Sequence, residues 1–101
     1  MLGIAKKAGK LFAGYDLSVE KIRKGEAYLA LAAKDISVKT FKNLKYEAER
    51  KKILALRLNE DINEVSRACS VKAGVLVLTD EGFAKALAQK IGDLQEEDFN
   101  L

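Results

Sequence analysis

The chain has 101 residues, a length typical of a single domain with one core. With 49% hydrophobic and 33% charged residues it has the composition of a globular protein, which excludes disorder throughout the chain. The longest apolar run covers residues 27–33 and is far shorter than the roughly 20 residues of a membrane helix. The first residues lead into lysines, so we expect neither a membrane span nor a secretory signal.

The side chains that most often carry catalysis are scarce. The sequence contains no histidine and a single cysteine, Cys69. An internal disulfide, a zinc site, and the Ser–His and Cys–His nucleophile pairs are therefore excluded. We expect a protein that is not an enzyme and needs no metal or cofactor, and a lone thiol fits the reducing cytoplasm. Cys69 lies on an apolar stripe, which favours a core position over a nucleophile.

Charge is distributed unevenly along the chain, although the total is only +3. Residues 1–52 carry thirteen basic and six acidic side chains, a net charge of +7, and residues 53–101 carry five and nine, a net charge of −4. Four of the acidic side chains lie in the last nine residues. A basic domain attracts polyanions by releasing their counterions, so nucleic acid, and RNA above all, is the leading class of partner. Lysine-rich surfaces are also common on proteins that bind no nucleic acid.

The first half of the chain predicts three helices and two strands. In chain order they are a short helix (1–8), a short strand (11–13), a helix that ends near residue 25, a buried strand (27–33) and a long basic helix (38–52). Ile4 and Ala8 mark the apolar face of the first helix. Asp16 or Ser18 is suited to cap the second helix, and Ser37 the third.

The second half continues the alternation. It predicts a strand (53–56), a helix after a capping box at 61–64, a strand (74–78) and a last helix that Gly92 ends. Alternating helices and strands, with apolar central strands, favour a three-layer α/β/α sandwich around a mostly parallel or mixed four-stranded sheet. Nothing marks a boundary before the acidic end, so we expect one domain over residues 1–92 and an acidic tail at 93–101.

Two weak motifs have simpler explanations. Residues 3–11 resemble a phosphate-binding loop, but the glycine spacing is wrong and Leu11 stands where a metal-binding hydroxyl is needed, so a helix is the better interpretation. Asp35 and Asp80 both follow predicted strands, and Asp80 with Glu81 has the form of a carboxylate pair. Helix capping explains these carboxylates better, because they stand where helices begin.

The order of several short motifs resembles a known family. The motifs are Ala8-Gly9-Lys10-Leu11 with Gly14, Ile22-Arg23-Lys24-Gly25, residues 33–40, residues 61–65, Arg67-Ala68-Cys69, and residues 80–85. Together they cover about residues 1–92 and resemble the ribosomal protein L7Ae superfamily, specifically its small bacterial YlxQ-like branch. The resemblance implies an α/β/α sandwich and a non-catalytic protein that binds kink-turn or ribosomal RNA in the cytoplasm, in association with the ribosome. We expect it to act as a monomer away from the membrane.

The resemblance also implies an RNA site. In the family, the turn at the position of Gly14 and the helix start after it enter the RNA groove at tandem sheared G·A pairs. An apolar residue in the loop after the helix of Cys69 packs on an extruded base, and Val71 and Ala73 are the candidates. Carried onto this sequence, the site consists of Lys10, Gly14, Tyr15, Asp16, Lys21, Lys34, Val71, Lys72 and Ala73. For Tyr15, a contact along its own helix face is favoured over stacking on a base.

The sequence departs from the family pattern close to Gly14. Asp16 stands where the family has Asn or a similar residue, Leu17 where Glu or Gln is frequent, and Glu20 where Lys is frequent. A carboxylate at position 20 would face phosphates, which weakens binding in a salt-dependent way. Ser66 replaces the usual glycine of a later helix. The alternative is therefore a protein-interaction module of the same fold that has lost kink-turn recognition.

Overall fold

The computed structural model describes residues 2–70 and 72–99, with side chains described as far as Ile91. In this part of the chain, five helices and four strands alternate. They are α1 (Leu2–Lys7), β1 (Leu11–Ala13), α2 (Tyr15–Arg23), β2 (Leu29–Ala32), α3 (Val38–Arg50), β3 (Leu54–Arg57), α4 (Ile62–Cys69), β4 (Val75–Leu78) and α5 (Glu81–Phe99). Every predicted helix and strand is present. Over the described ranges, no helix combines the length and apolar character needed to span a membrane.

The four strands form one mixed sheet in the order β1-β4-β2-β3. β4 runs antiparallel to both of its neighbours, with Leu76 opposite Ala13 on β1 and opposite Leu31 on β2, whereas β2 and β3 run parallel. The prediction of a mixed sheet is confirmed, and that of a mostly parallel sheet is wrong. β2 and β4 occupy the centre and are buried along their whole length, which explains why both read as unbroken apolar runs.

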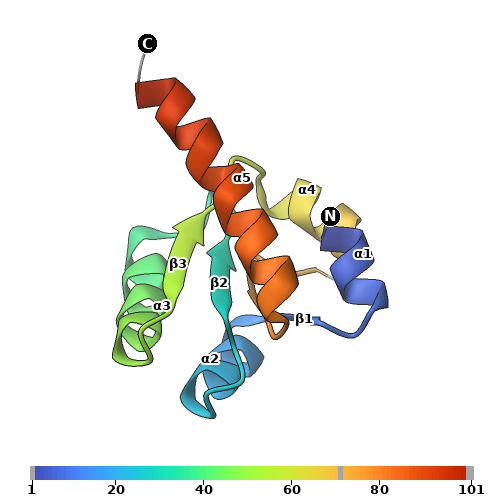
Figure 1. Ribbon diagram of the computed structural model, residues 1–101, viewed down its shortest axis with the longest axis vertical. Helices are drawn as coiled ribbons and strands as arrows, with labels where there is room; N and C mark the ends of the chain where they lie inside the picture. Colours follow the sequence, from blue (N-terminus) through green and yellow to red (C-terminus); the bar gives the residue numbers. More distant parts are fainter. Residues whose placement is uncertain (1, 71, 100–101) are drawn as a thin grey trace.

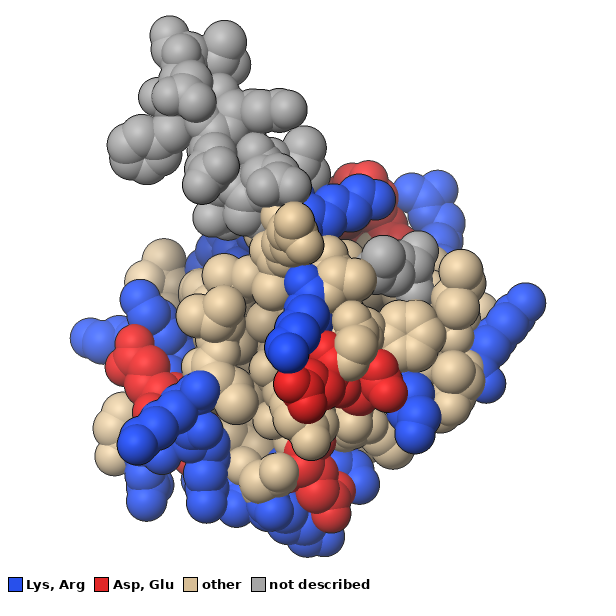
Figure 2. Space-filling view, viewed as in Figure 1, with Lys and Arg blue, Asp and Glu red and all other residues tan. Residues whose placement is uncertain are grey.

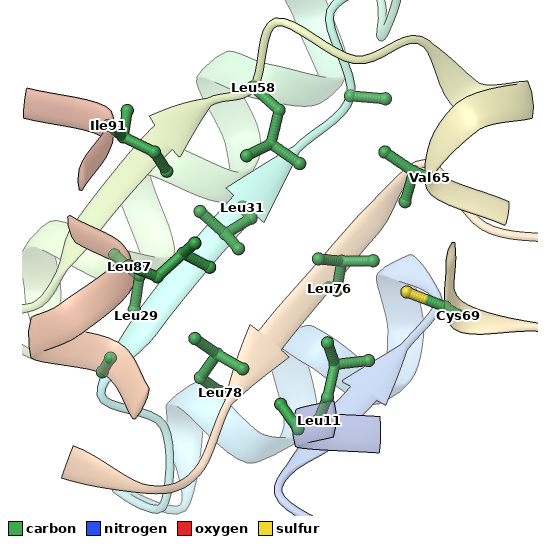
Figure 3. Close-up of a cluster of buried hydrophobic side chains, with 13 residues drawn as sticks. Leu11, Leu29, Leu31, Leu58, Val65, Cys69, Leu76, Leu78, Leu87 and Ile91 are labelled. Atoms are coloured by element: carbon green, nitrogen blue, oxygen red, sulfur yellow. The ribbon is translucent and has the colours of Figure 1, made fainter. Parts of the chain in front are cut away.

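Helices cover both faces of the sheet, which confirms the predicted α/β/α sandwich (Figure 1). α2 and α3 pack on one face, over a cluster formed by Ile22, Ala27, Ala30, Ala32, Leu44, Val75 and Val77. α1, α4 and α5 cover the other face, where the cluster in Figure 3 includes Leu11, Leu29, Leu31, Leu58, Val65, Cys69, Leu76, Leu78, Leu87 and Ile91. Alternate residues of the central strands supply the two clusters, because successive side chains of a strand point to opposite faces.

Three helix N-termini are capped as predicted. The side chain of Ser37 accepts a hydrogen bond of 3.1 Å from a backbone N–H in the first turn of α3. Asp61 and Glu64 form the capping box of α4. At the start of α5, the carboxylate of Asp80 accepts a 2.9 Å bond from the backbone N–H three residues later. Each bond satisfies an amide that the helix itself leaves without a partner.

Two predictions at the ends of the chain are wrong. Ile4 and Ala8, predicted on the buried face of α1, are exposed, Ile4 to 65%. Instead Ala5 is buried in the cluster beneath α1, α4 and α5. The last helix does not end at Gly92, and its backbone stays helical to Phe99, because a glycine weakens a helix without forcing it to end. The division of the chain after residue 92 stays a prediction.

Candidate functional site

Three connections meet at one end of the sheet, which we name the loop end. It comprises the turn into α2 (residues 14–16), the β2–α3 loop (34–37) and the residues before β4 (72–74). Two backbone hydrogen bonds join them, from the N–H of Gly14 to the carbonyl of Val75 at 2.8 Å and from Ala33 to Gly74 at 2.7 Å. The loop end therefore brings together six of the predicted site residues: Gly14, Tyr15, Asp16, Lys34, Lys72 and Ala73.

Gly14 turns the chain from β1 into α2. Its φ of 112° is one that side chains rarely adopt, and a Cβ built on it meets no atom within 4 Å. The backbone is therefore open to close approach by a ligand. The predicted caps of α2 are wrong: the helix begins directly after Gly14 with no side-chain cap, Asp16 lies in its first turn, and Ser18 is fully buried. The first amides of α2 remain free to face an anion.

Arg57, at the end of β3, holds the β2–α3 loop in place. Its guanidinium donates to the carbonyls of Lys34 and Ile36 at 2.8 and 2.9 Å, and it lies 4.5 Å from the centre of the Phe41 ring. The backbone N–H of Lys34 donates to the carbonyl of Glu60 at 2.7 Å. Lys34 thus has a fixed backbone and an exposed ammonium group. Sequence analysis missed Arg57, because a strand-end arginine that binds distant carbonyls leaves no local pattern.

The residues before β4 are held by one hydroxyl and by close packing. The Ser66 hydroxyl accepts a 3.1 Å hydrogen bond from the N–H of Ala73. Ser66 therefore links α4 to this loop, where the family resemblance implies a glycine. Ala73 is only 9% exposed, so its side chain supports the loop from within. A Cβ on Gly74 would overlap the side chain of Ile36 and lie 3.1 Å from Ile62, so glycine permits this close approach.

Two of the remaining predicted residues, Lys10 and Lys21, do not join this group. The carbonyl of Lys10 accepts from the N–H of Thr79, beyond the far end of β4 and about 13 Å from its start. The ammonium group of Lys21 lies 2.9 Å from the carboxylate of Glu26 and 4.5 Å from the centre of an aromatic ring on β1. Val71 lies outside the described residues. Lys34 and Lys72 are therefore the exposed predicted lysines at the loop end.

The departures from the family pattern close to Gly14 lie on the surface of α2. The carboxylate of Glu20 accepts a 2.8 Å hydrogen bond from the ammonium group of Lys24, and this bond lowers the pKa of Glu20 below 4.5. Glu20 is therefore ionised at neutral pH, and Lys24 balances its charge. Leu17 is 38% exposed and Tyr15 36% exposed. Each presents part of an apolar side chain beside the open backbone of Gly14.

The carboxylates considered as a catalytic pair serve the helices instead. Asp80 caps α5, and Glu81 pairs with Lys85 at 2.9 Å. Asp35 accepts a 2.9 Å hydrogen bond from the first backbone N–H of α4, so it fastens α4 to the loop end. Helix capping, the interpretation favoured by the sequence, is confirmed for Asp80. Asp35 binds the start of α4 and not of α3, the helix that follows it, which Ser37 caps. Cys69 is 1% exposed, and burial raises the pKa of its thiol, as befits a core residue rather than a nucleophile.

Known proteins share this sequence and fold. Two curated relatives carry the name RNA-binding protein YlxQ. The relative from Enterococcus faecium is 29% identical over 91 residues, which cover 90% of this chain and 87% of the relative. The relative from Bacillus subtilis (strain 168) is 33% identical over 88 residues, which cover 86% of this chain and 87% of the relative.

Solved structures and a family model agree with these relatives. A protein with unknown function from Bacillus halodurans C has a TM-score of 0.82 and 25% identity, covering 87% of this chain and 89% of its own. The Giardia lamblia 15.5kD RNA binding protein has a TM-score of 0.75 and 17% identity, covering 94% and 82%, and so shares the fold. The family model matches residues 1–88. The chain belongs to the ribosomal protein L7Ae/L30e/S12e/Gadd45 family.

Proposed function

We propose that this chain is a non-catalytic RNA-binding protein that recognises a kink-turn or a related structured RNA through its loop end. The observation that carries the proposal is the meeting of an open, uncapped helix start at Gly14 with the exposed lysines Lys34 and Lys72. Membership of the family supports it, as does the RNA-binding name of both curated relatives. We extend the proposal to ribosomal RNA, and thus to association with the ribosome, with the protein acting as a cytoplasmic monomer.

The geometry suits recognition by shape. Free amides at the start of α2 and two ammonium groups offer contacts to phosphates, and such contacts set the position and orientation of the RNA. Because Gly14 has no side chain, an RNA edge can come against its backbone. The loops are tied to each other by backbone hydrogen bonds and by Arg57, so they present a fixed surface. A fixed surface of this kind distinguishes an opened internal loop from a regular helix.

The direct test compares two RNAs in equilibrium titrations at two salt concentrations. One RNA contains a kink-turn, and in the other Watson–Crick pairs replace the sheared G·A pairs. We expect tight binding to the first RNA only. Equal and salt-sensitive binding to both would show that the basic surface supplies electrostatic affinity without recognition of shape, and would refute the proposal.

A variant pair locates the interface. Lys34→Glu with Lys72→Glu reverses both exposed lysines at the loop end, and we expect it to weaken kink-turn binding by about tenfold or more, since each lost phosphate contact reduces affinity. The matched control is Lys7→Glu with Lys85→Glu, which reverses two exposed lysines near the end of the sheet opposite the loop end. Equal losses in the two double variants would exclude the loop end as the RNA site.

A second candidate is a protein-interaction module of the same fold. It is favoured by the partly exposed Leu17 and by the ionised Glu20, which give the start of α2 an apolar and acidic character beside Gly14. This candidate predicts a defined protein partner that stays bound after nuclease treatment. Loss of every bound partner on nuclease treatment, together with tight kink-turn binding, would exclude it.

A further inference from the structure

The outward side of α3 and its end carry a concentration of basic side chains, which we name the α3 face. Its cations are Lys39, Lys42, Lys45, Arg50, Lys51 and Lys52, and all six side chains are exposed. Among them Tyr46 is 61% exposed, so its ring is accessible. In Figure 2, Lys and Arg side chains gather at the lower left, where Figure 1 places α3. The α3 face thus combines positive charge with an accessible ring.

The α3 face and α2 differ in how their cations are paired. Lys21, Arg23 and Lys24 of α2 each form an ion pair with a carboxylate, at 2.9, 2.7 and 2.8 Å. In the described part of the chain, none of the six cations of the α3 face forms an ion pair. Of the two acidic side chains on α3, Glu47 is held by Arg23. Of these two helices, it is therefore α3 whose cations are available to an anionic partner.

The spacing of these side chains forms a stripe. Lys39, Lys42, Tyr46 and Arg50 follow one another at intervals of three and four residues, which places them along one side of the helix. The guanidinium of Arg50 lies 5.8 Å from the centre of the Tyr46 ring. The stripe is about 16 Å long, given the rise of an α-helix. A ring flanked by cations along such a length matches the alternation of bases and phosphates in a nucleic-acid strand.

The stripe starts next to the loop end. α3 follows directly on the β2–α3 loop, so Lys39 lies in the first turn after that loop and Arg50 lies at the far end of the helix. An RNA held at the loop end can therefore continue along the α3 face without a gap. The ring of Tyr46 favours a single strand over a duplex, because only unpaired bases can stack on a side chain.

We propose that the α3 face binds a single-stranded RNA segment, with Tyr46 stacking on a base and the flanking cations contacting phosphates. The site is separate from the loop end and extends the proposed function to RNA that adjoins the structured element. An acidic protein would satisfy the cations but would leave the exposed ring without a stacking partner.

The experiment titrates the full chain with three RNAs. They are a compact kink-turn RNA, the same RNA with a single-stranded extension of about six nucleotides, and the same RNA with a duplex extension of that length. The variants are Tyr46→Ala, Tyr46→Phe and Lys42→Glu. The matched charge control is Lys7→Glu on α1, where an exposed lysine forms no ion pair among the described residues. Since the substituted side chains are exposed, the variants are expected to fold.

We expect the single-stranded extension to tighten binding of the unchanged protein at least about fivefold, as for one stacked base. Tyr46→Ala removes that gain and Tyr46→Phe retains it. Lys42→Glu makes the negative slope of log affinity against log salt shallower by about 0.7 for each lost phosphate contact, while Lys7→Glu does not. None of these variants changes binding of the compact RNA.

Three results would overturn the inference: no gain from the single-stranded extension, an equal gain from the duplex extension, or equal losses in Tyr46→Phe and Tyr46→Ala. Failure of the kink-turn proposal is a separate outcome. It would be seen with the compact RNA, which would bind equally well with and without its sheared G·A pairs. A strand that gains affinity from the α3 face would still do so in that case.

Discussion

The packing at Gly74 predicts a strong coupling between two residues of the loop end. In Gly74→Ala, the new Cβ overlaps the end of the Ile36 side chain. Overpacking of this kind destabilises a protein by about 1–3 kcal/mol, and the loss of backbone freedom in the unfolded chain offsets about 0.4–1 kcal/mol. We therefore expect a net loss of about 1–2 kcal/mol. Ile36→Val removes Cδ1, the atom nearest to the new Cβ, and by itself costs about 0.5–1.5 kcal/mol.

The double variant tests this reasoning, because the valine makes room for the alanine. We expect it to lose at least about 1 kcal/mol less than the sum of the two single variants, a coupling well above the scatter of independent sites. Urea denaturation of the four proteins, with the denaturant slopes compared, gives the free energies of unfolding. Additivity within about 0.5 kcal/mol would refute the packing argument, as would a Gly74→Ala protein as stable as the original.

Four further outcomes follow from the charges and burial described above. The ion pair with Arg23 lowers the pKa of Glu47, so its stabilisation is present above pH 4.5 and is lost as pH falls through the lowered pKa. Arg23→Gln should therefore reduce stability at pH 7, and the difference from the original protein should shrink as pH falls below 4.5, as measured by urea denaturation over that range. Ser18→Ala should raise the free energy of unfolding by about 1 kcal/mol, because the buried hydroxyl has no hydrogen-bond partner among the described residues. Glu20→Lys should strengthen RNA binding and steepen its salt dependence, and an unchanged affinity would place α2 outside the RNA. Thiol labelling should modify Cys69 only in denaturant, since the side chain is buried.

The layers of the fold follow from local patterns. The runs around Leu31 and Leu76 predict strands buried on both faces, and the cap at Ser37 and the box at Asp61 fix where two helices begin. These features act over a few residues, so a sequence window contains them. The direction of β4 is not a local feature of this kind, because it depends on which end of the sheet the chain reaches after α4. A strand buried on both faces gives the same apolar run in a parallel or a mixed sheet.

The sequence predicts the turn at Gly14 in the candidate site, but not the hydrogen bonds that hold the loops of the site together. Gly14 stands out because a glycine before an amphipathic helix suits a turn with positive φ. By contrast, the hydrogen bonds from Arg57 to the β2–α3 loop join residues more than twenty positions apart. Conversely, residues that are close in the sequence need not be close in the site. Lys10 lies four residues from Gly14 in the chain but at the opposite end of the strand.

The ion pairs in the structure show which positive charges in the first half of the chain are available to a partner. The sequence alone does not distinguish paired from unpaired lysines, and the family resemblance implies an RNA contact at the start of α2. In the structure, Lys21, Arg23 and Lys24 are each matched by a carboxylate, so the surface of α2 contributes little net charge. The loop end and α3, by contrast, carry exposed cations without an ion pair among the described residues, and counterion release depends on cations that can reach phosphates. A strand of RNA leaving the loop end would therefore be drawn along α3 and its exposed ring.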